Sequence, residues 1–385
     1  MDCVRIGIIG LGNMGSAHSK SLIEGLVPGM VLTAVADRQA SRRSWAKENL
    51  PDTVSVYAEG MDLIDSAAVD AILIAVPHYQ HPELAMAGFS HRLHVMCEKP
   101  AGVYTKQVRE MNDAAKRSQV TFGMMFNQRT NCVYRKMHEL IQSGKLGEIR
   151  RVNWLITDWY RTQTYYDSGA WRATWAGEGG GVLLNQCPHN LDLLQWICGM
   201  PVRIRAFCHE GKWHDIEVED DVTAYMEYPN GATGVFITTT GDAPGTNRFE
   251  VTTDMGKLVC ENEKLTFYRL AVPNSVFIRE SKESFATPEM TIEEIETDGL
   301  HLAHVGVLQA FTGNILRGEP LVADGTEGIN GLTLSNAMHL SSWLGKPVDI
   351  PFDEELFLEK LNIRRASSKH KEVSNPVVSD TSGSY

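Results

Sequence analysis

Two side chains in separate parts of the chain are suited to acid–base chemistry. Lys99 ends a predicted buried strand, and the proline that follows limits its local freedom. His189 follows Pro188, a residue that favours the first turn of a helix. The field at a helix N-terminus disfavours the imidazolium, so a neutral imidazole is available as a general base at neutral pH. The pattern predicts proton transfer at His189 beside the cation of Lys99.

Two polar residues flank this histidine. Asp192 lies three positions further along and on the same face of the predicted helix, where it could orient the imidazole or serve as a buried structural acid. Asn185 lies four positions before the histidine, and its amide can orient a hydroxyl group but cannot relay a proton. We therefore predict a catalytic set of Lys99, His189, Asn185 and Asp192.

A glycine-rich loop near the start of the chain predicts a dinucleotide site. The segment Gly10–Gly15 follows a strand and opens a helix, and Asp37 ends the next strand. Glycines let the backbone approach a pyrophosphate, the helix N-terminus presents N–H groups, and the carboxylate accepts from a ribose hydroxyl. Asp37 favours NAD, whereas the adjacent Arg38 could stack on adenine or neutralise a 2′-phosphate, so NADP stays possible.

Polar residues also follow three further predicted parallel strands. Ligands of such sheets bind beyond the carboxyl ends of the strands, so we expect these residues near the cofactor. A histidine in these loops is, taken alone, more often a loop or cap residue than a functional one. The predicted cofactor-binding residues are Gly10, Gly12, Asn13, Met14, Gly15, Asp37, Arg38, Pro77, His78, His81, Glu98, Lys99 and Asn127.

Aromatic residues are concentrated between positions 154 and 175. A 22-residue window at the overall frequency of 8% would hold about two aromatic residues, whereas this one holds seven. The rings could belong to a sheet core, or they could pack against the C–H faces of a hydroxyl-rich ring substrate. The predicted substrate-binding residues are Lys99, Arg129, Tyr160, Trp171, Arg172, Asn185 and His189.

The elements that must position these residues fall into two patterns. Up to about residue 128, short strands alternate with helical stretches, as in a doubly wound parallel sheet. Beyond about residue 150, consecutive strands joined by turns such as Pro229-Asn230-Gly231 predict an open-faced, mainly antiparallel sheet in an α+β domain. We predict a dinucleotide-binding domain over 1–128, a substrate-binding and oligomerisation domain over 129–366 and a mobile tail over 367–385.

Composition excludes several classes of protein. A net charge of −12 makes a nucleic-acid partner a poor expectation, and no apolar run is long enough to cross a membrane. The start of the chain lacks the features of a secretory signal, which predicts a cytoplasmic protein. Seven cysteines without C-x-x-C spacing predict free thiols, and the histidine pairs lack companion ligands, so no metal is expected.

The motifs together resemble those of the Gfo/Idh/MocA family, which includes glucose-fructose oxidoreductase and inositol dehydrogenase. The resemblance covers most of residues 4–350 and rests on five segments, the most specific being Glu98-Lys99-Pro100; the others are the Gly10–Gly15 loop, the Pro77-to-His81 segment, Trp171-Arg172 and the glycine run leading to His189 and Asp192. It implies a Rossmann domain, an open-faced sheet domain that often forms dimers or tetramers, and Lys99 with His189 as the catalytic pair. Many members carry an aspartate where this chain has Asn185, which puts a proton relay through that position in doubt.

The resemblance and the residues lead to one main functional expectation. We expect an NAD-dependent dehydrogenase that oxidises a secondary hydroxyl of a sugar, glycoside or cyclitol, with NADP possible as cofactor. One alternative is glycoside cleavage through transient oxidation and elimination, which leaves no net change in NAD. The other is a sensor that binds sugar or nucleotide without catalysis, because fold alone does not establish activity.

Overall fold

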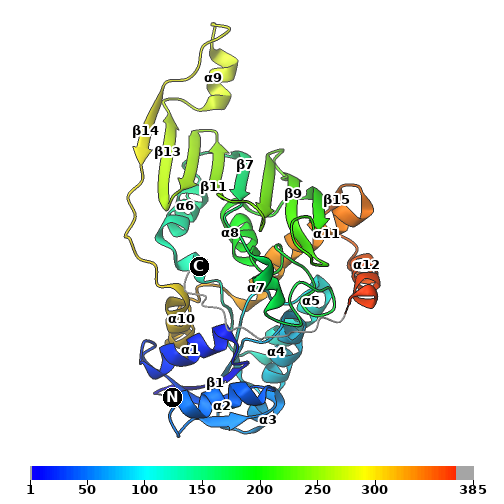
Figure 1. The fold of residues 1–385 in the computed structure, drawn as a ribbon. Helices are drawn as coiled ribbons and strands as arrows, with labels where there is room; N and C mark the ends of the chain where they lie inside the picture. Colours follow the sequence, from blue (N-terminus) through cyan, green and yellow to red (C-terminus); the bar gives the residue numbers. More distant parts are fainter. Residues whose placement is uncertain (1, 370–385) are drawn as a thin grey trace.

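The computed structural model describes residues 2–369 and contains two sheets, one above the other in Figure 1. The lower sheet has six strands in the order β3-β2-β1-β4-β5-β6, all parallel. Its strands are β1 (Val4–Ile9), β2 (Met30–Ala36), β3 (Ser55–Tyr57), β4 (Ala71–Ile74), β5 (His94–Cys97) and β6 (Phe122–Met124). The prediction of a doubly wound parallel sheet is confirmed.

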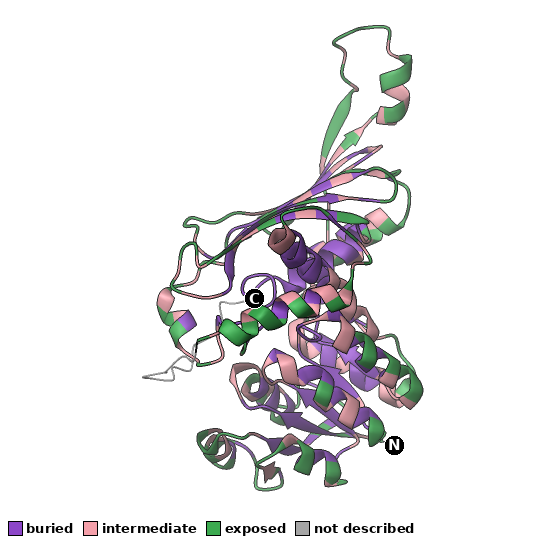
Figure 2. Ribbon diagram, turned by 90° about the vertical axis from the view of Figure 1, so that its right-hand side faces the viewer, coloured by how far each residue is buried: buried purple, intermediate pink, exposed green. Residues whose placement is uncertain are grey.

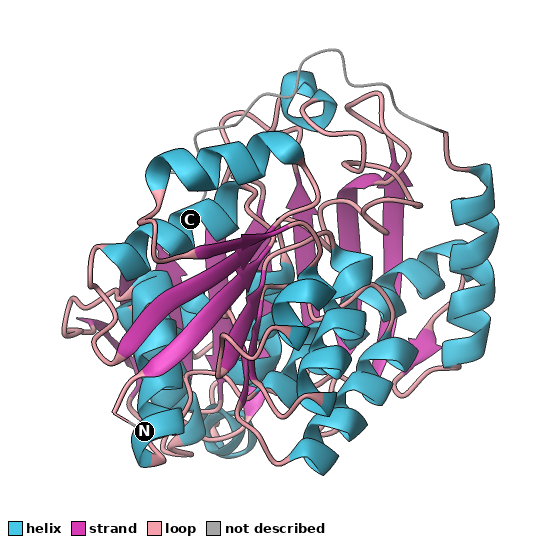
Figure 3. Ribbon diagram, turned by 90° about the horizontal axis from the view of Figure 1, so that it is seen from below, coloured by secondary structure: helices cyan, strands magenta, loops and turns pink. Residues whose placement is uncertain are grey.

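Helices cover both faces of this parallel sheet (Figure 3). The helices between its strands are α1 (Asn13–Ile23), α2 (Ala40–Asn49), α3 (Gly60–Asp65), α4 (His81–Ser90) and α5 (Thr105–Ser118). Apolar side chains of α3, α4 and α5 pack on one face, and those of α1 and α2 pack on the other. Strands buried on both faces explain why β4 is apolar throughout.

The upper sheet has nine strands in the order β14-β13-β12-β11-β7-β10-β9-β8-β15. They are β7 (Ile149–Ile156), β8 (Arg203–Glu210), β9 (Glu219–Glu227), β10 (Thr233–Thr239), β11 (Asn247–Thr253), β12 (Gly256–Glu261), β13 (Lys264–Leu270), β14 (Met290–Glu294) and β15 (Val348–Asp349). Only β7 and β10 pair in parallel among these strands. The predicted mainly antiparallel sheet is therefore confirmed.

The two faces of the upper sheet differ. In β9, Val222, Ala224 and Met226 are fully buried, whereas Tyr225 between them is exposed. On the covered face the Trp154 ring stacks on Phe249 with 4.0 Å between ring centres. This alternation leaves one face of the sheet open.

Helices pack between and around the two sheets. They are α6 (Cys132–Gln142), α7 (Gln163–Asp167), α8 (Pro188–Cys198), α9 (Asn274–Glu280), α10 (Ala303–Arg317), α11 (Gly328–Leu344) and α12 (Glu354–Ser367), with short 3₁₀ helices η1 (His78–Gln80), η2 (Asn127–Thr130) and η3 (Gly325–Glu327). Helix α8 is buried except at Trp196 and lies beneath the upper sheet (Figure 2). The hairpin that carries α9 projects from the edge of the upper sheet (Figure 1).

Helix α10 packs against the parallel sheet, although it lies late in the chain. Val307, Leu308 and Phe311 of this late helix belong to the same apolar cluster as Val4 and Leu32 of the parallel sheet. The helix thus covers the face that α1 also covers, although the boundary predicted at residue 128 assigns it to the second domain. The predicted tail begins inside α12, Ser368 and Lys369 bond to Glu217, and the remainder of the tail lies outside the described residues.

Candidate functional site

The glycine-rich loop has the shape that a pyrophosphate needs. Gly10 has a φ of +95°, and a Cβ there would meet the Ala75 carbonyl oxygen at 2.3 Å. A Cβ on Gly15 would meet the Gly10 carbonyl oxygen at 1.8 Å, whereas one on Gly12 would meet no atom within 4 Å. The loop therefore turns tightly onto α1, keeps open space at Gly12 and leaves the helix start without a side-chain cap. The predicted Asn13 and Met14 form the first helical positions.

Asp37 lies beside this loop at the end of β2. Its carboxylate accepts hydrogen bonds from the backbone N–H of Leu11 at 2.7 Å and of Gln39 at 2.8 Å. Arg38 points away into solvent and pairs with Glu59 at 2.8 Å. The carboxylate thus fixes the loop and is also placed where a ribose hydroxyl would donate to it.

Asn127 is the second feature that fits a dinucleotide. It begins η2, directly beyond the carboxyl end of β6, and its side chain is fully buried. Within residues 2–369 neither its Nδ2 nor its Oδ1 has a hydrogen-bond partner. A buried amide with both groups unsatisfied is costly, and a nicotinamide carboxamide carries the complementary donor and acceptor. The residues present therefore fit NAD.

The loops after β4 and β5 carry the predicted histidines. Pro77 leads into η1, where the Nδ1 of His78 lies 3.1 Å from the Glu178 carbonyl oxygen. Both ring nitrogens of His81 lie 2.7 Å from carbonyl oxygens, those of Pro100 and Val76. His81 thus ties the two loops together, which is the structural role that such a histidine has more often.

Glu98 is buried at the end of β5. Its Oε1 lies 2.7 Å from the Nε2 of His18 on α1, and its Oε2 accepts the backbone N–H of Lys99 at 3.2 Å. Burial alone would raise the pKa of Glu98, but the hydrogen bond and charge of His18 lower it to about 2. His304 of α10 lies against His18 with 5.4 Å between ring centres, and burial lowers its pKa to about 4. Neither histidine was in the predicted site, because their positions carry no motif.

Lys99 reaches from the parallel sheet toward the segment before α8. Its Nζ donates to the Asn185 backbone carbonyl at 3.1 Å. Burial lowers the pKa of Lys99, the charge of Glu98 raises it, and the charges of Arg161 and Arg172 lower it further. Only one of the three ammonium donors has a partner among the described residues, so two remain for a ligand.

His189 lies in the first turn of α8, and the structure buries it almost completely. Neither ring nitrogen has a hydrogen-bond partner in the described part of the chain. Burial lowers the pKa of His189 well below its ordinary value, and the nearby charges of Lys99 and His304 lower it further. The imidazole is thus neutral at pH 7 and close enough to Lys99 to interact with it electrostatically.

Asn185 connects this pair to aromatic and acidic side chains. Its Oδ1 accepts from the Tyr165 hydroxyl at 3.3 Å, and its Nδ2 donates to the Glu178 carboxylate. Glu178 is almost fully buried, also accepts the backbone N–H of Ala173 at 2.6 Å, and has a pKa raised by burial. Sequence reasoning missed Glu178; its place just before the glycine run was the only available signal.

Asp192 and Arg129 bond to each other, which agrees with the alternative that Asp192 is a buried structural acid. The Asp192 carboxylate bonds to the Arg129 guanidinium and to Gln195, not to His189, so it does not orient the imidazole in this structure. Arg129 also donates to Glu327 at 2.7 Å and is buried. The guanidinium already binds two carboxylates. Arg129 is therefore not among the substrate contacts that we propose, and we interpret its pair with Asp192 as structural.

The other predicted substrate contacts lie on the segment before the glycine run. Trp171 meets the His78 ring edge-on, with 5.7 Å between ring centres. Arg172 donates to the Tyr165 hydroxyl at 2.8 Å and lies over both the Tyr165 and Trp171 rings. Tyr160 is half exposed, and its carbonyl accepts from Arg161. Several of the clustered aromatic rings are core, as Trp154 and Trp175 are, so the core reading holds for these rings.

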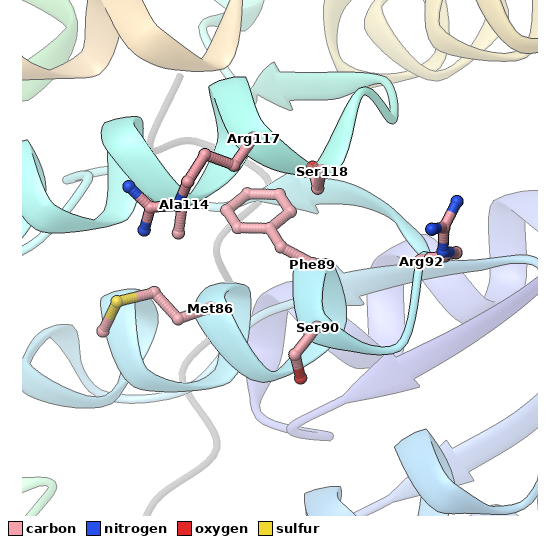
Figure 4. Close-up of a pocket in the computed structure, with 7 residues that line it drawn as sticks. All are labelled: Met86, Phe89, Ser90, Arg92, Ala114, Arg117 and Ser118. Carbon is pink, nitrogen blue, oxygen red and sulfur yellow. The ribbon is translucent and has the colours of Figure 1, made fainter.

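A separate surface hollow of about 320 Å³ lies between α4 and α5 (Figure 4). It is lined by Met86, Phe89, Ser90, Arg92, Ala114, Arg117 and Ser118. Arg92 precedes β5, whereas Lys99 follows it, so the hollow lies at the opposite end of the parallel strands from the site.

All seven cysteines are free, and no helix within residues 2–369 is long and apolar enough to span a membrane.

Known proteins resemble this chain along most of its length. The family model described as the NAD-binding Rossmann fold of the Gfo/Idh/MocA oxidoreductases matches residues 4–126, and that of the C-terminal domain matches residues 134–259. Myo-inositol 2-dehydrogenase of Thermotoga maritima is 25% identical over 350 residues, which is 87% of this chain and 95% of that protein.

Two further relatives extend this picture. Inositol 2-dehydrogenase of Rhizobium meliloti is 23% identical over 87% of this chain and 95% of that protein. The crystal structure of the WlbA dehydrogenase of Bordetella pertussis, in complex with NADH and UDP-GlcNAcA, superimposes with a TM-score of 0.75 and 23% identity. The superposition covers 91% of this chain and 100% of the WlbA chain, and at this identity it shows a similar fold.

Proposed function

The chain belongs to the Gfo/Idh/MocA family of NAD-binding oxidoreductases, and we propose that it oxidises a secondary hydroxyl group of a sugar, glycoside or cyclitol. The relatives named above as inositol dehydrogenases support a polyol or sugar as substrate. The observation that carries the proposal is that Lys99, after β5 of the parallel sheet, and His189, on α8 beneath the upper sheet, lie close enough to interact electrostatically. One is a cation with free donors, and the other is a buried neutral imidazole with no partner in the described residues.

Each side chain has a defined part in this proposal. Bound NAD supplies the hydride acceptor. His189 accepts the proton of the substrate hydroxyl, which its neutral state at pH 7 permits. Lys99 donates a hydrogen bond to the same oxygen and stabilises the negative charge that develops there. Asn185, held by Glu178, orients a neighbouring hydroxyl together with the Tyr165 phenol.

The cofactor end of the proposal rests on the loop and on Asn127. The glycine-rich loop and the uncapped start of α1 hold the pyrophosphate, and Asp37 accepts from the ribose. The amide of Asn127 would bond the carboxamide of the nicotinamide ring and so fix the orientation of the ring. His81 and Glu98 act indirectly, by fixing the loop that carries Lys99.

NADH absorbance, followed while inositols, hexoses and glycosides are offered, tests the function directly. We expect NADH to accumulate with at least one of them, and Lys99→Ala to lower kcat/KM by at least about a hundredfold. The Kd for NADH, measured by fluorescence, should stay within about twofold of the wild-type value, because Lys99 acts on the substrate oxygen. NAD binding without oxidation of any sugar or polyol would overturn the proposal. Release of a sugar without net NADH would instead indicate elimination.

A further inference from the structure

Two guanidinium groups lie beside the proposed reaction centre. The guanidinium carbon of Arg172 is 4.6 Å and that of Arg161 is 5.1 Å from the centre of the Tyr165 ring. A short chain of contacts leads from them to Lys99: Arg172 donates to the Tyr165 hydroxyl, which donates to Asn185, whose backbone carbonyl accepts from Lys99. Arg172 and Lys99 are thus joined through Asn185, and Arg161 lies near enough for its charge to lower the pKa of Lys99.

Two carboxyl groups sense the charges of these arginines, Glu178 that of Arg172 and Asp158 that of Arg161. The side chain of Arg161 donates to the Tyr160 carbonyl and to the Tyr165 hydroxyl, and that of Arg172 donates to the Tyr165 hydroxyl. Neither residue forms an ion pair with a carboxylate within residues 2–369. Both are half-buried, and so is Lys99. Like charges at such sites repel one another in a medium less polar than water, and Glu98, Glu178 and Asp158 offset part of this repulsion.

The carboxyl groups nearby form their hydrogen bonds with other residues. Glu178 accepts from Asn185 and from the Ala173 backbone, and Glu98 bonds to His18. Asp158 senses Arg161, and it bonds to the Asn247 side chain. With these groups engaged, most N–H donors of the two arginines are left to solvent or to a ligand.

We infer that the substrate carries a carboxylate, so that it is a sugar acid or polyol acid, and that Arg161 and Arg172 bind this group. The inference rests on the proposed function and narrows its substrate class. Guanidinium groups bind carboxylates through paired N–H donors, and the rings of Tyr165 and Trp171 cover the arginine faces and offer apolar contact to the sugar. Because few contacts separate Arg172 from Lys99, the carboxylate lies on the same small molecule as the reacting hydroxyl.

Matched pairs of neutral and acidic sugars test this inference with the NAD-loaded enzyme. Glucose with glucuronate, galactose with galacturonate and the corresponding alditols with aldonates differ in one charged group. We expect kcat/KM to be at least about tenfold higher for the acid of the best pair. Arg161→Gln and Arg172→Gln should each reduce this preference by about tenfold, mainly through KM. Arg279→Gln, on the projecting α9, is the matched control and should leave the preference unchanged.

Binding of the same sugars to the NADH-bound enzyme, measured by titration calorimetry, separates the two possible failures. If neither acids nor neutral sugars are oxidised, the proposed function falls, while calorimetry still reports whether acids bind more tightly and whether both arginine variants abolish that difference. If neutral sugars are oxidised as well as their acids, or if sugar phosphates are preferred to acids, the inference of a carboxylate is overturned and the dehydrogenase proposal stands.

Discussion

The Arg129 guanidinium holds the Asp192 carboxylate through two parallel hydrogen bonds, Nε to Oδ2 at 2.8 Å and an Nη to Oδ1 at 2.7 Å. Both side chains are almost fully buried. Arg129 comes from η2, beyond the last parallel strand, and Asp192 comes from α8 beneath the upper sheet. The pair therefore joins the two halves of the molecule one helical turn from His189, and it fixes where the imidazole lies relative to the cofactor loop.

Removing one partner of this pair should be strongly destabilising. We expect Asp192→Ala to lower the free energy of unfolding by about 3 kcal/mol, because a buried guanidinium keeps only Glu327 as counter-charge. Chemical denaturation followed by circular dichroism measures the change. The double variant Arg129→Met, Asp192→Leu removes both charges and should recover most of the loss. A single variant as stable as the wild type would contradict the structural role of the pair.

Replacing Asn127 should stabilise the cofactor-free protein and weaken cofactor binding. Asn127→Leu replaces a fully buried amide that has no partner in the described residues, so the cofactor-free protein should melt at a higher temperature. The Kd for NADH should rise at least about tenfold, because the amide no longer meets the nicotinamide carboxamide. Differential scanning fluorimetry and NADH fluorescence measure the two effects.

Asn112→Leu is the control for this prediction. The Asn112 amide is also buried, and its Oδ1 has no partner in the described residues, but its Nδ2 donates to the Thr326 carbonyl at 2.9 Å. Its loss should therefore lower the melting temperature and leave NADH binding unchanged. If Asn127→Leu behaved in the same way as this control, Asn127 would be a structural residue.

Most of the architecture could be predicted because local patterns and packing agree. The alternation of strands and helices up to about residue 128 indicated the parallel sheet, and α8 begins at Pro188 as that proline indicated. The position of α10 could not be predicted, since an amphipathic helix specifies an apolar face but not which sheet it covers. The projecting hairpin with α9 was missed for a related reason: its exposed Phe285 and Ile292 follow no core pattern.

The residues of the candidate site also differ in whether the sequence could predict them. The loop, Lys99 and His189 could be found because spacing along the chain carries their chemistry. The partner of Asp192 could not, since helical spacing places it near His189 and only the fold reveals that Arg129 lies closer. His18 could not be found for the same reason, because its partner Glu98 is remote in sequence. Glu178 lies near Asn185 in the sequence, but no helical or strand spacing brings the two side chains together.

Glu178 should act as a positioning residue through Asn185. In Glu178→Gln one acceptor oxygen becomes a donor that faces an N–H group, so the Asn185 amide loses its orientation toward Tyr165. We expect kcat to fall about tenfold while the Kd for NADH stays within about twofold. The exchange variant Asn185→Asp, Glu178→Gln restores one acid and one amide and should regain part of kcat. A loss of melting temperature without a loss of kcat would indicate packing alone.

Asp37 should determine the choice between the two dinucleotides. Its carboxylate would repel a 2′-phosphate, whereas Arg38 is held away by Glu59. Asp37→Ser with Glu59→Gln removes that repulsion and frees the arginine, so the ratio of kcat/KM for NADP to that for NAD should rise at least about tenfold. Glu59→Gln alone is the control and should change the ratio by less than about twofold. An unchanged ratio in the double variant would place the 2′-hydroxyl elsewhere.

The acid limb of the pH profile should lack a step near the ordinary histidine pKa of 6.5. Burial and the charges of Lys99 and His304 lower the pKa of His189, so its imidazole stays unprotonated as the pH falls through 6.5 and remains able to accept a proton. We expect kcat/KM to stay within about twofold between pH 8 and pH 6. Initial rates in buffers of constant ionic strength, with folding monitored by circular dichroism at each pH, make the measurement. A half-maximal loss of kcat/KM close to pH 6.5 in a fully folded enzyme would mean that an exposed histidine, rather than the buried one, is the base.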